Sequence, residues 1–325
     1  MPASSSPRPG RIDVHHHLFP PAYMAENSRR GITHEAGAPI PDWTPQKSLD
    51  VMDANGIEAA ILSLSAPGVY FGDKDGAVAL ARSCNEYAAS LSARHGDRFG
   101  FFAVLPMPFT QEACREAVHA LDELDADGVV LLGSTEGYFL GDPRYEELMA
   151  ELDRREAIVF VHPNMHASSK ALDLAAPGFV LEFLCDTTRA ALNLILRGVT
   201  ERHPRIRWIL AHAGGFLPYV AWRVSLVDAV PRFREGAPEG VLTYLRRFYF
   251  DTALSPSAMS MAALRELVEP DHILFGSDFP YAPAPLTALQ VQTLENGTVW
   301  NEATRRGIDR THALRLFPKY AQPPD

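Results

Sequence analysis

Cysteine is scarce in this chain, and long apolar runs and runs of like charge are missing from its sequence. The three cysteines, Cys84, Cys114 and Cys185, form no CxxC pair, and an odd count in a chain of this size indicates reduced thiols in a reducing compartment. No apolar run reaches the length of a membrane span. The net charge of −10, without basic clusters, argues against nucleic acid or an anionic membrane as the main partner. We therefore expect a cytoplasmic protein that acts on a small molecule.

The 325 residues suffice for one large domain or two small ones. Residues 1–10 are rich in Ser and Pro and carry no apolar core, so we expect a flexible tail there rather than a signal peptide. Eight nearly continuous apolar segments, typical of strands buried on both faces, alternate with helical patterns after it. This alternation favours a (β/α)8 TIM-like barrel over an open sheet, with residues 11–325 as one domain. The predicted strands begin near Arg11, Ala59, Phe99, Gly128, Ala157, Arg207, Phe248 and Ile273.

Further features of this predicted barrel lie in the segments between and after the strands. Residues 20–44 are rich in Pro and Gly without a clear period, which predicts a long irregular loop after the first strand. A helix is predicted over residues 187–203, with Asp186 as its N-cap. Extra C-terminal helices are predicted near residues 286–294 and 301–316. Substrate specificity in barrels resides in the loops, here residues 20–44, 66–74 and 163–180.

The stretch IDVHHHLFP supplies the first candidate metal ligands. Side chains alternate along a strand, so His15 and His17 point the same way while His16 points to the other side. This spacing suits two imidazoles that hold one ion, whereas His16 reads as a packed, structural histidine. By itself, a His-x-His pair is more often structural than metal-binding.

Three more polar residues end other predicted strands: His162 ends the fifth, His212 the sixth and Asp278 the eighth. The carboxyl ends of barrel strands converge on one mouth, where polar residues indicate function. Imidazole and carboxylate without thiolate suit zinc, and less well manganese or iron. We assign His15, His17, His162 and Asp278 as ligands of one divalent metal.

Other residues near the predicted mouth are candidates for catalysis, for support of the ligands or for substrate binding. His212 is either a fifth ligand or, as we prefer, an acid/base beside the metal. Asp251 ends the seventh strand, where a supporting role is at least as well founded as a catalytic one. Tyr138 and Phe183 follow the fourth and fifth strands and are candidate walls of a substrate pocket. The fourth strand, GVVLLG, ends without a lysine that could bridge two ions, so we expect one metal.

The motifs IDVHHHLFP, VFVHP, ILAHAGGFLPYVAWR and FGSDFP, in this order, resemble the amidohydrolase-2 branch of the metal-dependent amidohydrolase superfamily. Within it, they resemble the decarboxylases related to 2-amino-3-carboxymuconate-6-semialdehyde decarboxylase. The stretches LSAPGV, YFLGDPRYEELMAEL and CDTTRAALNLI are most similar to the 6-methylsalicylate decarboxylase subgroup. The resemblance runs from Arg11 to about Phe317.

The resemblance implies the same four metal ligands and places His212 on the family's catalytic histidine. It also places Arg223 on an arginine that binds substrate carboxylate, in relatives across a dimer interface. A guanidinium fork suits a carboxylate, although an arginine on a helix surface is the alternative. Some relatives have Glu at the position of His15; the histidine here favours zinc, with manganese as the alternative. A homodimer or higher homo-oligomer is implied as well.

Two enzymatic functions remain open at this point. The first is a non-oxidative decarboxylase of a small aromatic acid, such as a 2-hydroxybenzoate or 6-methylsalicylate-like acid, or of an unsaturated acid, with His212 and Asp278 as the catalytic residues. The second is a metal-dependent hydrolase of a lactone, amide or ester, in which the same ligands activate water. A non-catalytic scaffold barrel would be expected to lack a ligand, and all the ligands are present.

Overall fold

The computed structural model describes residues 10–321, so the expected N-terminal tail falls, apart from Gly10, outside the described residues. Eight strands form one parallel sheet, and the predicted (β/α)8 barrel is confirmed. In their order around the sheet, the strands are β1 (Arg11–His17), β4 (Ile57–Ser63), β5 (Phe99–Val104), β6 (Gly128–Leu132), β9 (Ile158–His162), β10 (Arg207–Leu210), β11 (Tyr249–Asp251) and β12 (Ile273–Leu274). Each begins within two residues of its predicted start.

The segment that follows β12 closes the barrel against β1. The amide of Val14 donates to the carbonyl of Phe275 at 3.0 Å, the amide of Asp278 to that of His15 at 2.8 Å, and the amide of His17 to that of Phe279 at 2.7 Å. The closing hydrogen bonds therefore lie just past the end of β12, in the segment that carries Asp278.

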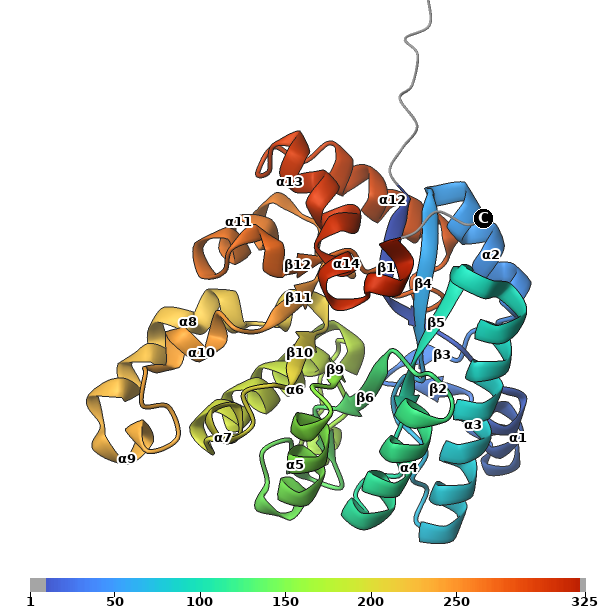
Figure 1. Cartoon of the computed structure of the whole chain (residues 1–325), viewed down its shortest axis with the longest axis horizontal. Helices are drawn as coiled ribbons and strands as arrows, with labels where there is room; N and C mark the ends of the chain where they lie inside the picture. Colours follow the sequence, from blue (N-terminus) through green and yellow to red (C-terminus); the bar gives the residue numbers. More distant parts are fainter. Residues whose placement is uncertain (1–9, 322–325) are drawn as a thin grey trace, which may run out of the picture.

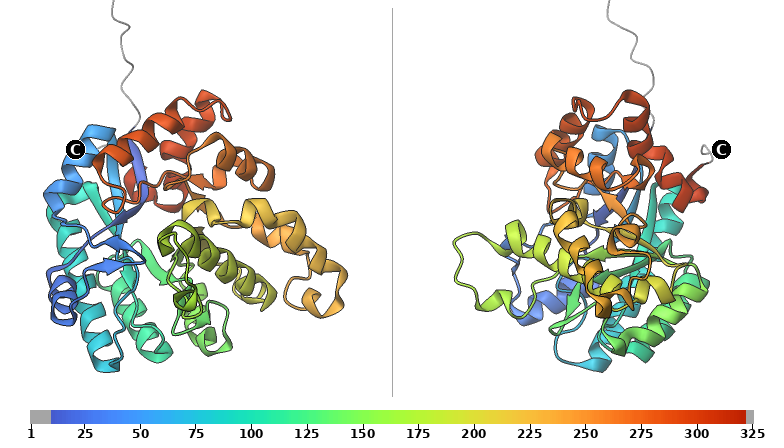
Figure 2. Two further views of the ribbon diagram at one scale, coloured as in Figure 1. Left: turned by 180° about the vertical axis from the view of Figure 1, so that it is seen from behind. Right: turned by 90° about the vertical axis from the view of Figure 1, so that its left-hand side faces the viewer.

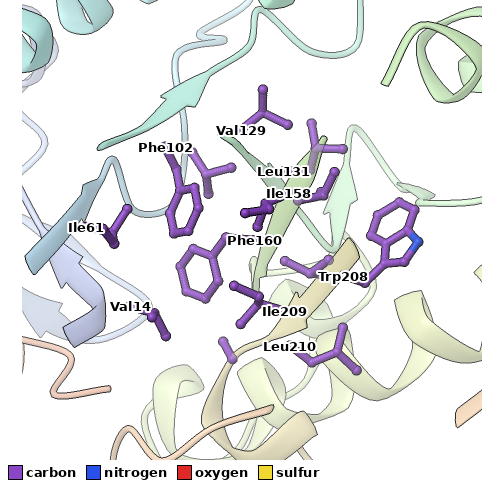
Figure 3. Close-up of a cluster of buried hydrophobic side chains, with 14 of the residues drawn as sticks. Val14, Ile61, Phe102, Val129, Leu131, Ile158, Phe160, Trp208, Ile209 and Leu210 are labelled. Atoms are coloured by element: carbon purple, nitrogen blue, oxygen red, sulfur yellow. The ribbon is translucent and has the colours of Figure 1, made fainter. Parts of the chain in front are cut away.

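Aromatic and branched side chains fill the inside of the barrel. Phe102 and Phe160 stack with their ring centres 5.4 Å apart, and Figure 3 shows the two rings side by side among the strands. Because parallel partners share a face, Val130 beside Phe160 and Val104 beside Val130 also point inward. The interior is thus a packed floor beneath the mouth rather than a channel.

Helices surround this sheet in Figure 1, and none within residues 10–321 is both long and apolar enough to cross a membrane. Helix α2 (Pro45–Asn55) has clear boundary signals: Thr44 caps its first turn, and Gly56 ends it at φ 64°. The predicted C-terminal helices are present, the second as two helices joined by a π-helical turn over Gly307–Thr311. The helices after α1 are α2 (Pro45–Asn55), α3 (Lys74–His95), α4 (Thr110–Asp122), α5 (Glu146–Arg154), α6 (Gly178–Leu196), α7 (Val199–Arg202), α8 (Leu217–Ser225), α9 (Pro231–Arg234), α10 (Val241–Leu245), α11 (Ala258–Leu267), α12 (Ala284–Glu295), α13 (Glu302–Arg306) and α14 (Ala313–Leu316).

The prediction of an irregular loop over residues 20–44 is wrong. The segment forms helix α1 (Pro21–Arg30) and a hairpin of β2 (His34–Glu35) and β3 (Ala38–Pro39). Pro21 occupies the first helical position, and Gly31 ends the helix at φ 66°. These residues punctuate a helix because proline fits its first turn and glycine its left-handed end.

The prediction that Asp186 caps a helix is also wrong, because α6 begins earlier, at Gly178. Asp186 lies inside α6 and accepts hydrogen bonds from the Ser134 hydroxyl at 2.5 Å and the Asn164 amide at 2.9 Å. It therefore ties the segments that follow β6 and β9 to the helix. The start of α6 stands out from the barrel in the right-hand view of Figure 2, beside the hairpin, where the amide of Phe179 donates to the carbonyl of Ala36 at 3.1 Å.

Candidate metal centre and active site

Four side chains from three separate strand ends meet at the mouth of the barrel. One ligand atom from each of His15, His17, His162 and Asp278 lies within 4.8 Å of all the others, and all four residues are buried. His15 and His17 come from β1, His162 ends β9, and Asp278 follows β12. The structure therefore brings together the four residues that the sequence suggested as ligands.

The outer nitrogens of the three imidazoles are all occupied by acceptors. Nδ1 of His15 lies 2.7 Å from Oδ2 of Asp251, Nδ1 of His17 lies 3.1 Å from the carbonyl of Ser63, and Nδ1 of His162 lies 2.8 Å from the carbonyl of Pro163. If each Nδ1 carries the donated hydrogen, each neutral ring presents a lone pair at Nε2. The Nε2 atoms of His15 and His17 are 3.1 Å apart and lie 3.3 and 3.0 Å from Oδ1 of Asp278. This convergence of acceptor atoms fits a divalent cation.

The electrostatics of the cluster also favour positive charge. Burial lowers the pKa of His15, but the carboxylates of Asp251 and Asp278 outweigh it and raise this pKa to about 10. Burial and the neighbouring histidines hold the pKa of His162 well below its usual range. Burial opposes ionisation of Asp278, yet the charge on His15 and hydrogen bonds from the histidines keep its pKa well below the usual value. The carboxylates of Asp251 and Asp278 therefore favour positive charge at this point, which a proton on His15 or a divalent ion would supply.

His212 stands on the other side of Asp278. Its Nε2 lies 3.4 Å from Oδ2 of Asp278, while its buried Nδ1 has no hydrogen-bond partner among residues 10–321. His212 and Asp278 have positive φ angles of 55° and 61°, which are uncommon outside glycine. Such backbone conformations persist where the surroundings enforce them, and they concentrate at functional sites. The arrangement suits His212 as an acid/base partner of Asp278.

Asp251 connects the ligand His15 to the segment that carries His212. One carboxylate oxygen accepts from His15, and the other accepts from the backbone amides of His212 and Ala253 at 2.9 Å. The side chain is buried against Gly276, where an added Cβ would lie 2.9 Å from Cβ of His15 and 3.1 Å from Cβ of Asp251. Glycine is therefore required at position 276 to let the ligand and its supporting carboxylate approach each other.

His16 lies outside the cluster, on the opposite side of β1. Its Nδ1 is 3.0 Å from Oδ2 of Asp13 and its Nε2 is 2.8 Å from the hydroxyl of Ser48. Both ring nitrogens are thus occupied in a buried network. The expected structural role of His16 agrees with this placement.

The three predicted substrate residues differ in position. Phe183 is 9% exposed, and its ring centre lies 5.9 Å from that of His162. Tyr138 lies in the short strand β8 (Tyr138–Phe139), where the guanidinium of Arg144 sits 3.3 Å from its ring centre. Arg223 is exposed near the end of α8. The structure therefore brings Phe183 to the cluster, and leaves Tyr138 and Arg223 away from it within one chain.

Sequence reasoning missed two hydroxyl groups beside the ligands. The Ser65 hydroxyl lies 3.5 Å from Nε2 of His162, and the ring of Tyr281 packs edge-on against His17 at 5.7 Å. Burial raises the pKa of the Tyr281 phenol, so the hydroxyl stays protonated. In the sequence, the one indication that Tyr281 lies beside the ligands is its position three residues after Asp278.

A cavity of about 610 Å³ lies among the loops that follow β1, β4, β6 and β9. This volume is within the usual range for small-molecule sites, about 300–1,000 Å³. Glu35, Tyr70, Glu136 and His166 are among its lining residues. Loops at this end of a barrel carry substrate-binding residues.

Comparison with known proteins identifies the family. The amidohydrolase family model matches residues 12–319. The chain belongs to this family. It is 37% identical to a 6-methylsalicylic acid decarboxylase of Penicillium expansum, over 95% of this chain and 96% of the relative. It is 39% identical to the decarboxylase yanB of Aspergillus niger, over 97% of this chain and 89% of that protein.

Solved structures in the family share the same architecture. A structure described as an amidohydrolase II superposes with a TM-score of 0.90 at 32% identity, covering 95% of this chain and all of the other. A 2,6-dihydroxybenzoate decarboxylase solved with 2,6-dihydroxybenzoate superposes with a TM-score of 0.82 at 26% identity, covering 95% and 99%. Two of these four relatives are thus named for an aromatic acid, 6-methylsalicylic acid in one and 2,6-dihydroxybenzoate in the other.

Proposed function

We infer that this protein is a metal-dependent, non-oxidative decarboxylase of a small aromatic acid of the 2-hydroxybenzoate type. The observation that carries the inference is the meeting of His15, His17, His162 and Asp278 within 4.8 Å, with His212 at hydrogen-bonding distance of Asp278. Membership of a family whose relatives are named decarboxylases of such acids supports it. A hydrolase of a lactone, amide or ester remains the alternative reaction for the same ligands.

The residues that would hold the metal are the four of the cluster, and His212 and Asp278 would be the catalytic pair. When bound, a divalent ion supplies a Lewis acid and a template that orients the carboxylate and the adjacent phenolic oxygen. Phe183, beside His162, would cover one face of the aromatic ring of the substrate. The donor set of imidazoles and one carboxylate favours zinc, with manganese as the alternative.

Asp278 and His212 would supply the proton that replaces carbon dioxide. Their side chains are 3.4 Å apart, so a proton can pass from His212 to Asp278 and from there to the ring carbon that bears the carboxylate. The new C–H bond interrupts the aromatic ring. The C–C bond to the carboxylate then breaks, its electron pair restores the ring, and carbon dioxide leaves, so that no oxidant or organic cofactor is needed.

Arg223 would bind the substrate carboxylate from the partner subunit of a homodimer or higher homo-oligomer. It lies on α8 between exposed apolar side chains: Tyr219 is 87%, Trp222 75% and Leu226 57% exposed. Contiguous exposed apolar surface is typical of an interaction site. A second copy on α8 would cover this surface and place Arg223 in a partly buried position.

We also propose that residues 11–325 are one domain and that the protein is cytoplasmic. The eight-stranded sheet that begins at Arg11 and is extended by the segment after β12 supports a single domain. Cys84, Cys114 and Cys185 are free thiols, as expected in a reducing compartment.

The deciding experiment measures products under anaerobic conditions. Purified enzyme, loaded with zinc or with manganese, is incubated with 2-hydroxybenzoates, and released carbon dioxide and phenol are quantified. Equal amounts of the two products, abolished by a chelator, support the decarboxylase. Ring opening or hydrolysis of a lactone, amide or ester without gas would favour the alternative.

A further inference from the structure

Ser65 places a hydroxyl group at the ligands of the candidate metal centre. It lies two residues past the end of β4, whose last residue, Ser63, is the register partner of His17. Because side chains alternate along an extended chain, Ser65 faces the mouth as Ser63 does. The amide of Gly68 donates to the carbonyl of Ser65 at 3.1 Å and holds the backbone in a turn. Ser65 is thus buried, with its hydroxyl 3.5 Å from Nε2 of His162.

This nitrogen of His162 faces the centre of the cluster, since Nδ1 of the same ring lies 2.8 Å from the carbonyl of Pro163. At 3.5 Å, the hydrogen bond from the Ser65 hydroxyl to Nε2 is long and weak. When Nε2 binds a cation, its lone pair can no longer accept this hydrogen. The Ser65 hydroxyl is then left to donate to an oxygen of a molecule that lies at the same ligands.

Tyr281 supports the Ser65 hydroxyl. Its ring packs edge-on against His17, with the ring centres 5.7 Å apart. Its phenol interacts with the hydroxyl of Ser65, which favours a lower tyrosine pKa, but burial outweighs this and raises the pKa. The phenol therefore keeps its hydrogen and can donate it to the oxygen of Ser65, while Ser65 donates its own hydrogen into the mouth.

The cavity of about 610 Å³ leads to this pair of hydroxyls. Asn164, two residues after the ligand His162, lines the cavity. Glu35 lines it as well, and burial together with the charge of Glu35 raises the pKa of Tyr281. A small acid that enters through the cavity therefore meets Ser65 and the ligands at its inner end.

We propose that Ser65 donates a hydrogen bond to the carboxylate of the aromatic acid and that Tyr281 is the residue that positions the Ser65 hydroxyl. The inference rests on the proposed decarboxylase function. The carboxylate is the favoured acceptor because it is ionised at neutral pH, and a hydrogen bond to an ionised acceptor is about twice as strong as one to a neutral acceptor. An ionised carboxylate has about four acceptor positions, so this bond is compatible with one from Arg223.

The bond should act on binding rather than on the chemical step. The carboxylate loses its charge as carbon dioxide forms, so a hydrogen bond to it is no stronger in the transition state than in the bound acid. Ser65→Ala should therefore raise KM by about 10-fold or more, with kcat changed by less than about 3-fold. Tyr281→Phe keeps the ring against His17 and should raise KM by about 3-fold, because it removes only the support of Ser65.

A binding measurement tests the acceptor without turnover. Calorimetry on the zinc- or manganese-loaded enzyme gives the Kd of benzoate, which has the carboxylate without a phenolic oxygen, and of phenol, which has the oxygen without a carboxylate. Ser65→Ala should weaken benzoate by about 10-fold and leave phenol unchanged. Addition of Tyr281→Phe to Ser65→Ala should weaken benzoate no further, since the tyrosine acts through the serine.

Two matched controls remove a hydroxyl elsewhere in the chain. Ser92→Ala removes a hydroxyl that donates to the carbonyl of Phe99 at 2.7 Å. Tyr249→Phe removes the hydroxyl of a tyrosine whose ring stacks on His272 with the centres 4.5 Å apart. Both controls should leave the Kd of benzoate and of phenol unchanged.

The outcomes separate this inference from the proposed function. Failure of benzoate to bind the natural enzyme, unchanged benzoate affinity in Ser65→Ala, or equal weakening of benzoate and phenol would overturn the role of Ser65, even if the acid is decarboxylated. Loss of metal in Ser65→Ala would overturn it as well, because Ser65 would then support the ligands. Selective weakening of benzoate without release of carbon dioxide from any acid would refute the decarboxylase alone.

Discussion

The two ends of the barrel both bury charged side chains, but the partners of these side chains differ between the ends. At the amino end, Arg11 is 2% exposed and donates to Asp309 at 2.9 Å, to Glu295 at 2.7 Å and to the carbonyl of Asn55 at 2.6 Å. Asp127 there accepts from Lys319 at 2.8 Å and from the amide of Phe101 at 3.0 Å. These ionic groups are matched by opposite charges or by backbone partners.

At the carboxyl end, by contrast, like groups face one another. His15, His17 and His162 direct their rings at one point, and Nδ1 of His212 has no partner within residues 10–321. A buried network of opposite charges connects distant parts of the fold, whereas a cluster of imidazole lone pairs and a carboxylate fits the binding of a cation. The comparison teaches that the pairing of opposite charges at one end and the convergence of like groups at the other, rather than burial, distinguish the end that stabilises from the end that reacts.

Removing a ligand at the mouth should give the largest effect on activity. His162→Ala takes away one of four ligands, and we expect decarboxylation to fall by about 1,000-fold, the scale of the several kcal/mol that a metal contributes to a transition state. Metal content by emission spectrometry should fall with it, in a variant that still folds. His203→Ala, which alters a histidine paired with Glu146 outside the mouth, is the control. Full metal content in His162→Ala would remove the site as drawn.

At the amino end, we expect a substitution to lower stability and to leave the metal content unchanged. Arg11→Ala leaves Asp309 buried beside Glu295 without its cation and should lower the free energy of unfolding by about 3–5 kcal/mol. Chemical denaturation measures the loss, and metal bound per folded molecule should stay constant. Arg202→Ala, in the exposed pair with Glu146, should cost about 1 kcal/mol or less. A loss of metal in folded Arg11→Ala would show that the amino end also supports the metal centre and would contradict the proposed difference between the two ends.

Asp251 tests whether the mouth depends on its supporting carboxylate. Asp251→Asn weakens the bond that fixes the ring of His15, so metal affinity should fall by about 10–100-fold. Competition with a chromophoric chelator gives the Kd directly. Asp153→Asn makes the same substitution in a buried aspartate bonded to Arg205 and should leave that Kd unchanged. An unchanged Kd in Asp251→Asn would show that the ligands are positioned without it.

Arg223 should give the smallest effect of the four. Arg223→Ala removes one charge-assisted hydrogen bond to the substrate carboxylate, so KM should rise about 10-fold with little change in metal content. Arg115→Ala, an exposed arginine on α4, is the matched control. Sedimentation of the wild type should show a dimer or larger. A monomer with full activity would exclude the role of a second copy.

The sequence was sufficient to locate the strands and the cluster because both depend on local pattern. Strand positions follow from apolar runs, and the placement of His162 and Asp278 at strand ends is enough to predict that they meet. Helix α1 was missed because Pro21 and Gly31, which lie at its two ends, are residue types that are also common in loops. The partners of Arg11 could not be inferred, because Asp309 and Glu295 reach it only when the chain has closed. Asp186 was misassigned because its partners, Ser134 and Asn164, come from other strands.

The closing contact between the first strand and the last has a consequence for biosynthesis. His15 and His17 leave the ribosome well before Asp278, whose amide donates to the carbonyl of His15. A growing polypeptide therefore holds an incomplete set of ligands until Asp278 has been translated. Loading with the ion must follow synthesis, and a product truncated before position 278 would be expected to lack both a sealed barrel and a complete metal site.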